Sequence, residues 1–129
     1  MPTFGKRSLE NLKNCHPNLK IIAHEAIKEY DFSVICGLRT KQDQEKAFNG
    51  GFSKVKYPNS RHNQSLLLGR KDISDAFDLC PYPIDWNDIG RFKALSVIIK
   101  RIAKEKNIQI EYGGDWAKFR DYPHYQLKI

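Results

Sequence analysis

Two segments of the chain carry residues whose types and spacing suit a catalytic metal site. Near the end stands Asp121-Tyr122-Pro123-His124-Tyr125, in which a carboxylate precedes a histidine by three positions. In the middle stand Ser60-Arg61-His62 and Asp75-Ala76-Phe77-Asp78-Leu79. Two imidazoles and one carboxylate can hold zinc with a position left open for water, and a second carboxylate can act as general base. If these segments meet in space, the chemistry they predict is hydrolysis.

Histidines and carboxylates also have simpler interpretations. Of the four histidines, His24 falls on an expected helix and His16 precedes Pro17 at a turn, so both are expected to be structural. Asp78 stands between apolar residues in an expected strand, where an uncompensated carboxylate is costly. A metal would supply the missing cation, and an ion pair with one of the 22 Lys or Arg residues would do so too. Spacing alone leaves both possibilities open.

Apolar periodicity and turn residues predict an α+β fold, a small and largely antiparallel sheet with helices packed on one face. Thr40 and Asp85 are expected to cap helices, and Gly50-Gly51 and Gly113-Gly114 to form turns. Residues 52–74 are expected to be irregular. The expected helices are 8–14, 19–30, 41–48 and a long one from Asp85 to about Lys106; the expected strands are 32–36, 76–80, 108–112 and 124–127.

Length and composition limit the possible classes of protein. At 129 residues, of which 40% are hydrophobic, residues 1–129 are expected to form a single globular domain. The first residues lack the apolar stretch of a secretion signal, and no apolar run is long enough to span a membrane. The three cysteines have no paired spacing and are interpreted as reduced core thiols. These features favour a chain made in a reducing cytoplasm.

The net charge of +7 favours polyanionic partners. The basic residues are dispersed, with no compact run of the kind that binds nucleic acid. Solvated helix faces account for such a surface, and attraction to an anionic bacterial wall is the functional alternative. We therefore expect no specific nucleic-acid partner and no membrane insertion.

Several of these motifs, taken in order, resemble one enzyme family. Ser60-x-His62 followed by Ala76-x-Asp78-Leu79-x-Pro81, and then Asp121-x-x-His124-Tyr125, are similar to the signatures of the zinc D-Ala-D-Ala carboxypeptidases and L-alanyl-D-glutamate endopeptidases that cleave peptidoglycan. The resemblance covers nearly the whole chain. Its further motifs are Gly37-Leu38-Arg39-Thr40 with Gln44, Tyr112-Gly113-Gly114-Asp115-Trp116, His16-Pro17-Asn18-Leu19 and Tyr82-Pro83-Ile84-Asp85-Trp86.

The resemblance implies a role for each matching residue. It makes His62, Asp78 and His124 the ligands of Zn²⁺, whose water attacks the peptide bond. It makes Asp121 the general base, which passes the proton on to the leaving amine. It also implies the hedgehog/D-Ala-D-Ala-peptidase type of fold. Three further residues are implied around the substrate: Arg39 to stabilise the oxyanion, and Ser60 and Gln44 to bind substrate or support the geometry of the site. From the residues alone, Arg39 could instead pair with Asp43, and Asp121 could be a simple turn carboxylate.

One departure from the family pattern concerns the middle of the chain. His62 and Asp78 lie 16 positions apart, farther than is usual in the family, so residues 63–74 look like an enlarged loop. Lengthening a loop costs little entropy, and the site is expected to survive. Whether Asp72 or Asp75 competes as a ligand is left open. We expect the loop, with Leu66-Leu67-Leu68 at its tip, to form a wall or lid of the substrate groove, or else to contact a partner.

The resulting prediction is a zinc peptidase that cuts the stem peptide of peptidoglycan, namely an L-alanyl-D-glutamate endopeptidase of the phage endolysin type. The enzyme is expected to be a monomer that waits in the cytoplasm and reaches the cell wall after holin-type release. A D-alanyl-D-alanine carboxypeptidase or dipeptidase is the alternative within the class. A non-catalytic basic binding module on the same fold is the alternative from another class.

Overall fold

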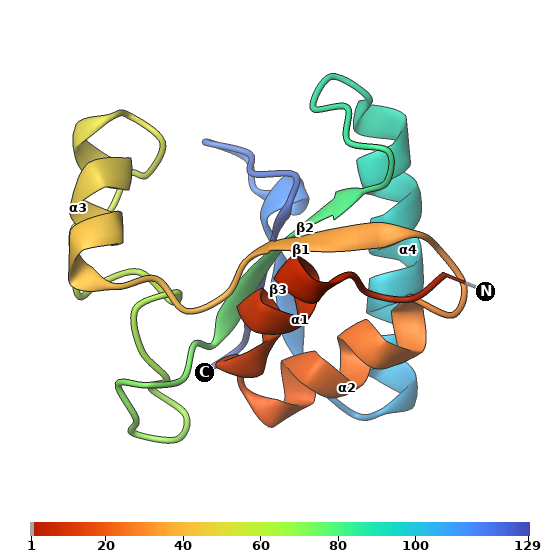
Figure 1. Ribbon diagram of the computed structural model, residues 1–129, viewed down its shortest axis with the longest axis horizontal. Coiled ribbons are helices and arrows are strands. Elements are labelled where there is room, and N and C mark those ends of the chain that lie inside the picture. Colours follow the sequence, from red (N-terminus) through yellow and green to blue (C-terminus); the bar gives the residue numbers. More distant parts are fainter. Residues whose placement is uncertain (1) are drawn as a thin grey trace.

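The computed structural model describes residues 2–129. Four antiparallel strands form one sheet in the order β1-β2-β4-β3 (Figure 1). The elements along the chain are α1 (Lys6–Lys13), α2 (Pro17–Ala26), β1 (Phe32–Cys36), α3 (Lys41–Asn49), β2 (Ala76–Pro81), α4 (Ile89–Glu105), β3 (Ile110–Tyr112), the short 3₁₀ helix η1 (Gly113–Asp115) and β4 (His124–Leu127). The predicted α+β class is confirmed, with the predicted helices and strands present in the predicted order.

One face of the sheet builds the hydrophobic core. Helices α1, α2 and α4 cover this face, whereas α3 stands beside the sheet (Figure 1). Because side chains alternate along a strand, Phe77 and Leu79 of β2 point into the core while Asp78 points to the opposite face. Tyr125 and Leu127 of β4 join the core in the same way. The fold therefore leaves the second face of the sheet free for polar side chains.

The ends of three predicted helices differ from expectation for local reasons. Helix α2 begins at Pro17, where the His16 ring accepts a hydrogen bond from the Asn18 backbone N–H. Helix α4 is capped by Asp88 rather than Asp85. The Asp85 carboxylate accepts from the backbone N–H of Asn87 and closes a turn before the helix. Helix α2 also ends at Ala26, four residues earlier than predicted, and α1 begins two residues earlier.

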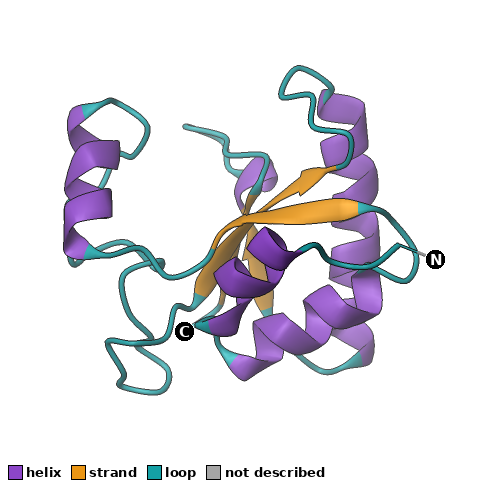
Figure 2. Cartoon of the chain, in the orientation of Figure 1, coloured by secondary structure: helices purple, strands orange, loops and turns teal. Residues whose placement is uncertain are grey.

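The long segment between α3 and β2 contains neither helix nor strand, as predicted (Figure 2). Its second half is ordered by the buried carboxylate of Asp75, which accepts hydrogen bonds from the backbone N–H groups of Leu66 and Leu67 at 2.8 and 3.3 Å. The three leucines at its tip are exposed. Asp72 pairs with Arg70 at the surface. Both candidate competing carboxylates are thus engaged within this loop.

A tight contact joins α1 to the end of β1. The Asn11 side chain donates to the backbone oxygens of Val34 and Ile35, at 2.8 and 3.2 Å. A Cβ added at Gly37 would collide with the backbone oxygen of Asn11 and lie 2.8 Å from Cys15 Sγ. Only glycine lets the chain pass this close to α1, and the backbone that follows leads into the site.

We expect Gly37→Ala to lower the free energy of unfolding by about 1–3 kcal/mol, because the backbone of α1 or β1 must shift to admit a methyl group. Denaturant unfolding measures this change. Gly90→Ala is the matched control, since its Cβ would meet only Asp88 at 3.5 Å within a helix. Alanine is favoured over glycine there, so the control should be neutral or up to about 1 kcal/mol more stable. Equal stability of the two variants would contradict the contact described.

Candidate metal centre and cleft

The three predicted metal ligands meet on the free face of the sheet. Asp78 on β2 and His124 on β4 are direct cross-strand partners. His62 comes from the loop after α3, and its backbone oxygen accepts a hydrogen bond from the Arg39 N–H at 2.8 Å. His62 and His124 are 2% and 6% exposed, so neither imidazole is simply a surface group. The enlarged loop between His62 and Asp78 does not prevent their approach, as expected.

The three candidate ligand atoms form a nearly equilateral triangle. His62 Nε2 lies 3.2 Å from His124 Nδ1 and 3.3 Å from Asp78 Oδ1. His124 Nδ1 lies 3.2 Å from the same oxygen. Two ligands of a tetrahedral zinc, each bonded at about 2.0–2.1 Å, are separated by about 3.3 Å. The spacing of the donors therefore fits one face of a zinc tetrahedron.

Hydrogen bonds on the far side of each ring fix which nitrogen faces the centre. The Nδ1–H of His62 donates to the carbonyl oxygen of Gly37 at 2.8 Å, which leaves Nε2 as an acceptor. The Nε2–H of His124 donates to Gln126 Oε1 at 2.8 Å, which leaves Nδ1 as an acceptor. The Gln126 amide in turn donates to Glu111 Oε2 at 3.1 Å. Such partners orient metal-binding histidines.

Three acceptors thus converge on one point. Burial alone would lower the pKa of His62, but the carboxylate of Asp78 raises that pKa to about 10. Burial alone would raise the pKa of Asp78, and the two imidazoles instead hold it well below its usual range. Without a metal, a proton between these groups supplies the positive charge. A divalent cation would supply the same positive charge, and the three donor atoms already have the spacing to bind it.

Asp121 lies next to this centre, held by a tight turn. One of its carboxylate oxygens lies within 4.8 Å of ligand atoms of both Asp78 and His124. Its backbone N–H donates to the oxygen of Gly113 at 3.1 Å, and a Cβ on Gly113 would lie 3.1 Å from the Cβ atoms of Asp121 and His124. Burial, and then the negative charge of Asp78, raise the pKa of Asp121 above its ordinary value. These causes leave the carboxylate a better proton acceptor than an exposed aspartate.

Arg39 and Gln44 form a linked pair beside the centre. The Arg39 guanidinium lies 3.7 Å from Asp78 Oδ2 and donates to Gln44 Oε1 at 2.9 Å. Among the described residues it makes no ion pair with Asp43, the alternative that the sequence left open. Gln44 is fully buried and binds Ser53 Oγ and the Val55 carbonyl through its amide nitrogen. Gln44 therefore does not reach a substrate directly, and of its two expected roles only support of site geometry fits.

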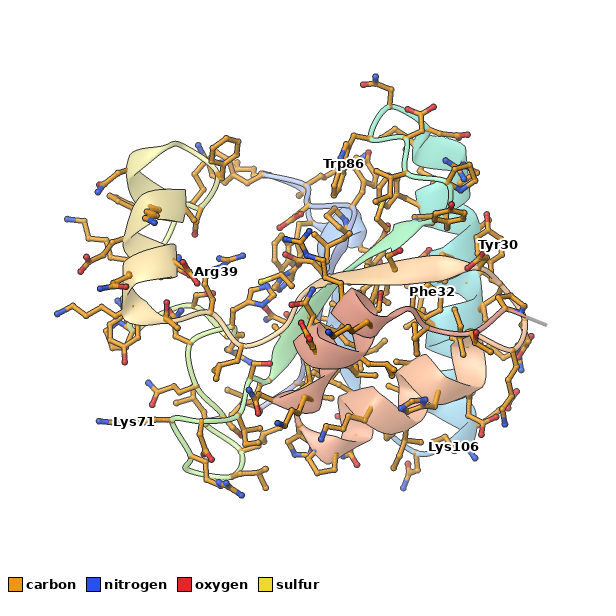
Figure 3. All side chains as sticks on the ribbon, in the orientation of Figure 1. Tyr30, Phe32, Arg39, Lys71, Trp86 and Lys106 are labelled. Carbon is orange, nitrogen blue, oxygen red and sulfur yellow. The ribbon has the colours of Figure 1, made fainter. Side chains whose placement is uncertain are left out.

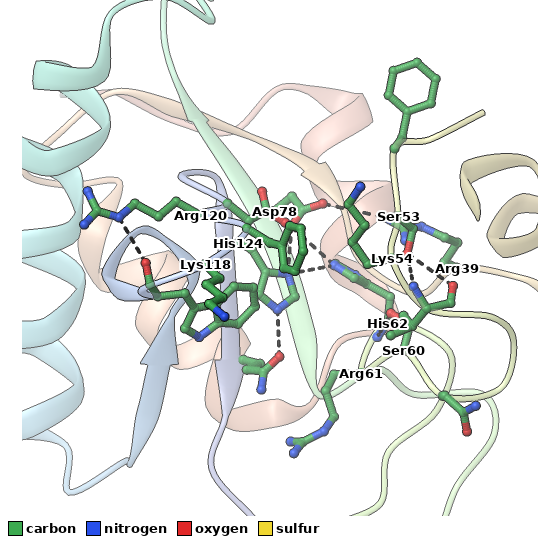
Figure 4. Close-up of a pocket in the computed structure, with 17 residues that line it drawn as sticks. Arg39, Ser53, Lys54, Ser60, Arg61, His62, Asp78, Lys118, Arg120 and His124 are labelled. Atoms are coloured by element: carbon green, nitrogen blue, oxygen red, sulfur yellow. Dashed lines mark hydrogen bonds and ion pairs between the residues drawn. The ribbon is translucent and has the colours of Figure 1, made fainter. Parts of the chain in front are cut away.

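A cleft of about 730 Å³ opens above the centre (Figure 4). Ser60 lines this cleft, and its Oγ accepts a hydrogen bond from the His62 N–H at 3.2 Å. Trp116 forms part of the wall, with its ring centroid 5.3 Å from that of His124. The cleft is lined by Arg39, residues 52–55, residues 59–62, Asp78, Trp116, residues 118–121, His124 and Gln126. No residue of 63–74 is among them, so the prediction that this loop forms a wall or lid is wrong.

Several residues of the site could not be singled out from the sequence. Cys36 was predicted to be a core thiol, and this prediction is wrong. Its Sγ lies 3.8 Å from His62 Nδ1 and 3.7 Å from Arg39 Nη2. The register of β1 against β2 shifts between Val34 and Cys36, and this irregularity brings Cys36 opposite Asp78. Gln126 was also missed, although the sequence held a signal for it. It lies two positions after His124 in a strand, so the two side chains must share a face of the sheet.

The chain belongs to a known family. It matches the family model of the phage L-alanyl-D-glutamate peptidases over residues 2–128. It is 34% identical over 131 residues to the L-alanyl-D-glutamate peptidase of Escherichia phage T5, covering 97% of this chain and 88% of that protein. It is 32% identical over 128 residues to the peptidoglycan L-alanyl-D-glutamate endopeptidase CwlK of Bacillus subtilis (strain 168), covering 87% of this chain and 72% of that one.

A solved structure is similar over nearly the whole fold. The crystal structure of the Serratia marcescens L-Ala D-Glu endopeptidase ChiX superposes with a TM-score of 0.79 at 30% sequence identity, covering 98% of this chain and 90% of that one. The resemblance inferred from the sequence motifs, to the peptidoglycan-cleaving peptidases, is thereby confirmed. In this chain, no helix within residues 2–129 is both long and apolar enough to cross a membrane.

The orientation of His124 by Gln126 gives a test of the centre that needs no substrate. We expect Gln126→Ala to weaken zinc binding by about 10–100-fold with the fold intact, because the ring loses the partner that fixes its tautomer. His124→Ala should abolish near-stoichiometric zinc. Competition with a chromogenic chelator measures both effects. Gln109→Ala, at an exposed position outside the site, is the control. Unchanged zinc affinity in Gln126→Ala would contradict the proposed orientation.

Proposed function

We propose that the chain is a zinc peptidase that hydrolyses the L-alanyl-D-glutamate bond in the stem peptide of bacterial peptidoglycan. The observation that carries this proposal is the convergence of three acceptors from His62, Asp78 and His124 at the floor of an open cleft. Membership of the phage L-alanyl-D-glutamate peptidase family supports the choice of bond. A non-catalytic binding module would leave this costly cluster without a purpose.

The donor set suits zinc, with two imidazole nitrogens and one carboxylate oxygen leaving a coordination position open toward the cleft. Zinc bound there would supply Lewis-acid activation of a water molecule and of the scissile carbonyl group. The protein's own part is to hold the two histidines as acceptors through Gly37 and Gln126. This arrangement is expected to make metal binding pH-dependent, since each ligand must be deprotonated.

Asp121 is proposed to move the proton. Its carboxylate, kept basic by burial and by Asp78, would take a proton from the attacking water and give it to the leaving amine. Arg39 is proposed to face the oxygen on which negative charge develops. Its guanidinium is held beside the centre by Gln44, which is itself fixed by Ser53 and Val55. A cation placed in advance at this position lowers the barrier without reorganisation during the reaction.

The site of action proposed for the chain is the cell wall. Relatives named as L-alanyl-D-glutamate peptidases come from bacteriophages of Escherichia and Listeria. An endolysin that is made in the cytoplasm and reaches the wall after holin-type release is consistent with these names. A monomer is the proposed form.

Mass analysis of the soluble products from purified peptidoglycan tests the function and the bond together. We expect fragments with a new amino-terminal glutamyl residue, matched by stems that end in alanine. Release of free D-alanine would instead indicate the carboxypeptidase or dipeptidase alternative. The absence of any released fragment from zinc-loaded protein would contradict a peptidase of either kind.

Two variants separate chemistry from metal binding. Asp121→Asn should retain the fold and zinc but lose about 10²–10⁴-fold in turnover, since proton transfer is removed. Arg39→Met should lose about 10²–10³-fold in kcat, because the developing charge is left without its cation. Turnover of a synthetic stem peptide, with zinc content measured in parallel, gives both values. Full activity in Asp121→Asn would mean that another group is the base.

The pH profile carries a further expectation. Asp121 must be deprotonated to act, so kcat/KM should fall as the pH falls through its pKa. Because burial and Asp78 raise that pKa, the acid midpoint should lie above the ordinary aspartate value of 3.8. Zinc content is measured at each pH as the control, so that loss of metal is not mistaken for protonation of the base. A kcat/KM that shows no loss at acid pH while zinc is retained would contradict the role of Asp121.

A further inference from the structure

The cleft carries more positive charge than the proposed catalysis uses. Its lining contains five basic residues, whereas its two acidic residues, Asp78 and Asp121, both belong to the catalytic cluster. The basic residues are Arg39, Lys54, Arg61, Lys118 and Arg120. Figure 4 shows them distributed around Asp78, His62 and His124. A surplus of this kind, close to a cation site, calls for an anionic ligand.

Three of the five are engaged by the protein itself. Arg39 is held by Asp78 and Gln44. Arg61 donates to the Leu127 carbonyl oxygen at 3.0 Å, and Arg120 donates to the Trp116 carbonyl oxygen at 3.0 Å. Figure 4 shows the Arg120 side chain extending away from Asp78 and His62. These three side chains are therefore directed by contacts within the fold.

Lys54 and Lys118 are left without a counter-charge. Within residues 2–129, neither forms an ion pair. They come from two segments far apart in the sequence, Lys54 from the loop after α3 and Lys118 from the loop before β4. In Figure 4 Lys118 is drawn to the left of His124, and Lys54 is drawn between Asp78 and Arg39. Both side chains line the same cleft, and neither ammonium group is neutralised there by a carboxylate of the described residues.

The position of Lys54 is supported by Phe119, the residue that follows Lys118. Its Nζ lies 5.3 Å from the centroid of the Phe119 ring, within the range of a cation–π interaction. Phe119 is 70% exposed and has a φ angle of 55°, a conformation that bulky residues rarely adopt. Strained residues of this kind persist where they serve a site. Phe119 thus has a strained backbone conformation, and its ring lies next to the Lys54 ammonium group.

We propose that Lys54 and Lys118 form a carboxylate-binding subsite, which takes the free carboxyl group of the glutamyl residue next to the cleaved bond. The proposal rests on the function proposed above. A glutamyl residue has two carboxyl groups, and when the peptide continues through one of them, the other remains as a carboxylate near neutral pH. The subsite would select the acidic stem peptide over neutral peptides that contain alanine.

A pair of synthetic stem peptides tests the subsite. Both contain the L-alanyl-D-glutamyl bond, and they differ only in whether the free glutamyl carboxyl is a carboxylate or a carboxamide. We expect the wild-type enzyme to prefer the carboxylate peptide by about five- to tenfold in kcat/KM, mainly through KM. In the Lys54→Met/Lys118→Met double variant this preference should vanish, whereas zinc content and cleavage of the carboxamide peptide should persist. The single variant Lys118→Arg, which keeps the positive charge, should retain part of the preference for the carboxylate peptide.

Lys71→Met is the matched control. It removes the same charge from the loop of residues 63–74, outside the cleft, where Figure 3 shows Lys71 pointing outward. The control should keep the wild-type preference. A preference that survives in the double variant, or that is absent in the wild type, would overturn the subsite.

Binding measured without turnover separates this proposal from the proposed function. In the Asp121→Asn background, calorimetry should show tighter binding of the carboxylate peptide, with the difference lost when Lys54 and Lys118 are replaced. If that difference is found but the wild type cleaves neither peptide, the proposed function fails and the subsite stands. If both peptides are cleaved and bound alike, the subsite fails and the function stands.

Discussion

The carboxylate of Asp78 is the constraint on which the rest of the site depends. Its neighbours Phe77 and Leu79 are fully buried in the core, so the strand cannot rotate to carry the carboxylate into solvent. A carboxylate so enclosed requires positive charge within reach. The protein surrounds it with His62, His124 and Arg39, and each of these is oriented by a further contact. The arrangement of the surrounding loops follows from keeping these partners in place.

The two faces of the sheet divide the work between stability and chemistry. The core face packs against α1, α2 and α4, which fixes the relative positions of β2 and β4 and hence of Asp78 and His124. The other face carries Asp78, His124, Gln126 and Glu111, linked by hydrogen bonds across three strands. Helix α3 contributes little to the core and instead holds Gln44, which directs Arg39. Strands β2 and β4 therefore carry Asp78 and His124, while loops supply His62 and most of the lining of the cleft.

The sequence predicted most of the fold because its signals were local. The largely apolar run of residues 76–80, ended by Pro81, and the apolar spacing in α4 identified those elements within a few residues. The cap of α4 was misplaced because Asp85 and Asp88 are equally good caps, and only the turn at Asn87 decides between them. The motifs around His62, Asp78 and His124 named the residues that the structure brings together.

What the sequence could not predict depends on contacts between distant segments. Cys36 joins the site because β1 is irregular against β2, which no local pattern of β1 indicates. The enlarged loop of residues 63–74 was expected over the cleft because long loops often serve sites. The direction of this loop is set instead by the buried carboxylate of Asp75. This carboxylate accepts hydrogen bonds from the backbone N–H groups of Leu66 and Leu67 and so holds the tip of the loop outside the cleft. The pairing of Lys54 with Phe119 likewise joins residues 65 positions apart, since 119 − 54 = 65.

Anomalous diffraction at the zinc absorption edge, from a crystal of the zinc-loaded protein, tests the central claim most directly. We expect one strong peak at the floor of the cleft, about 2.0–2.2 Å from His62 Nε2, Asp78 Oδ1 and His124 Nδ1. Asp121 should lie near the peak without ligating it. A peak bound through Cys36 or Asp121 in place of one of the three ligands, or no peak in the cleft, would contradict the account.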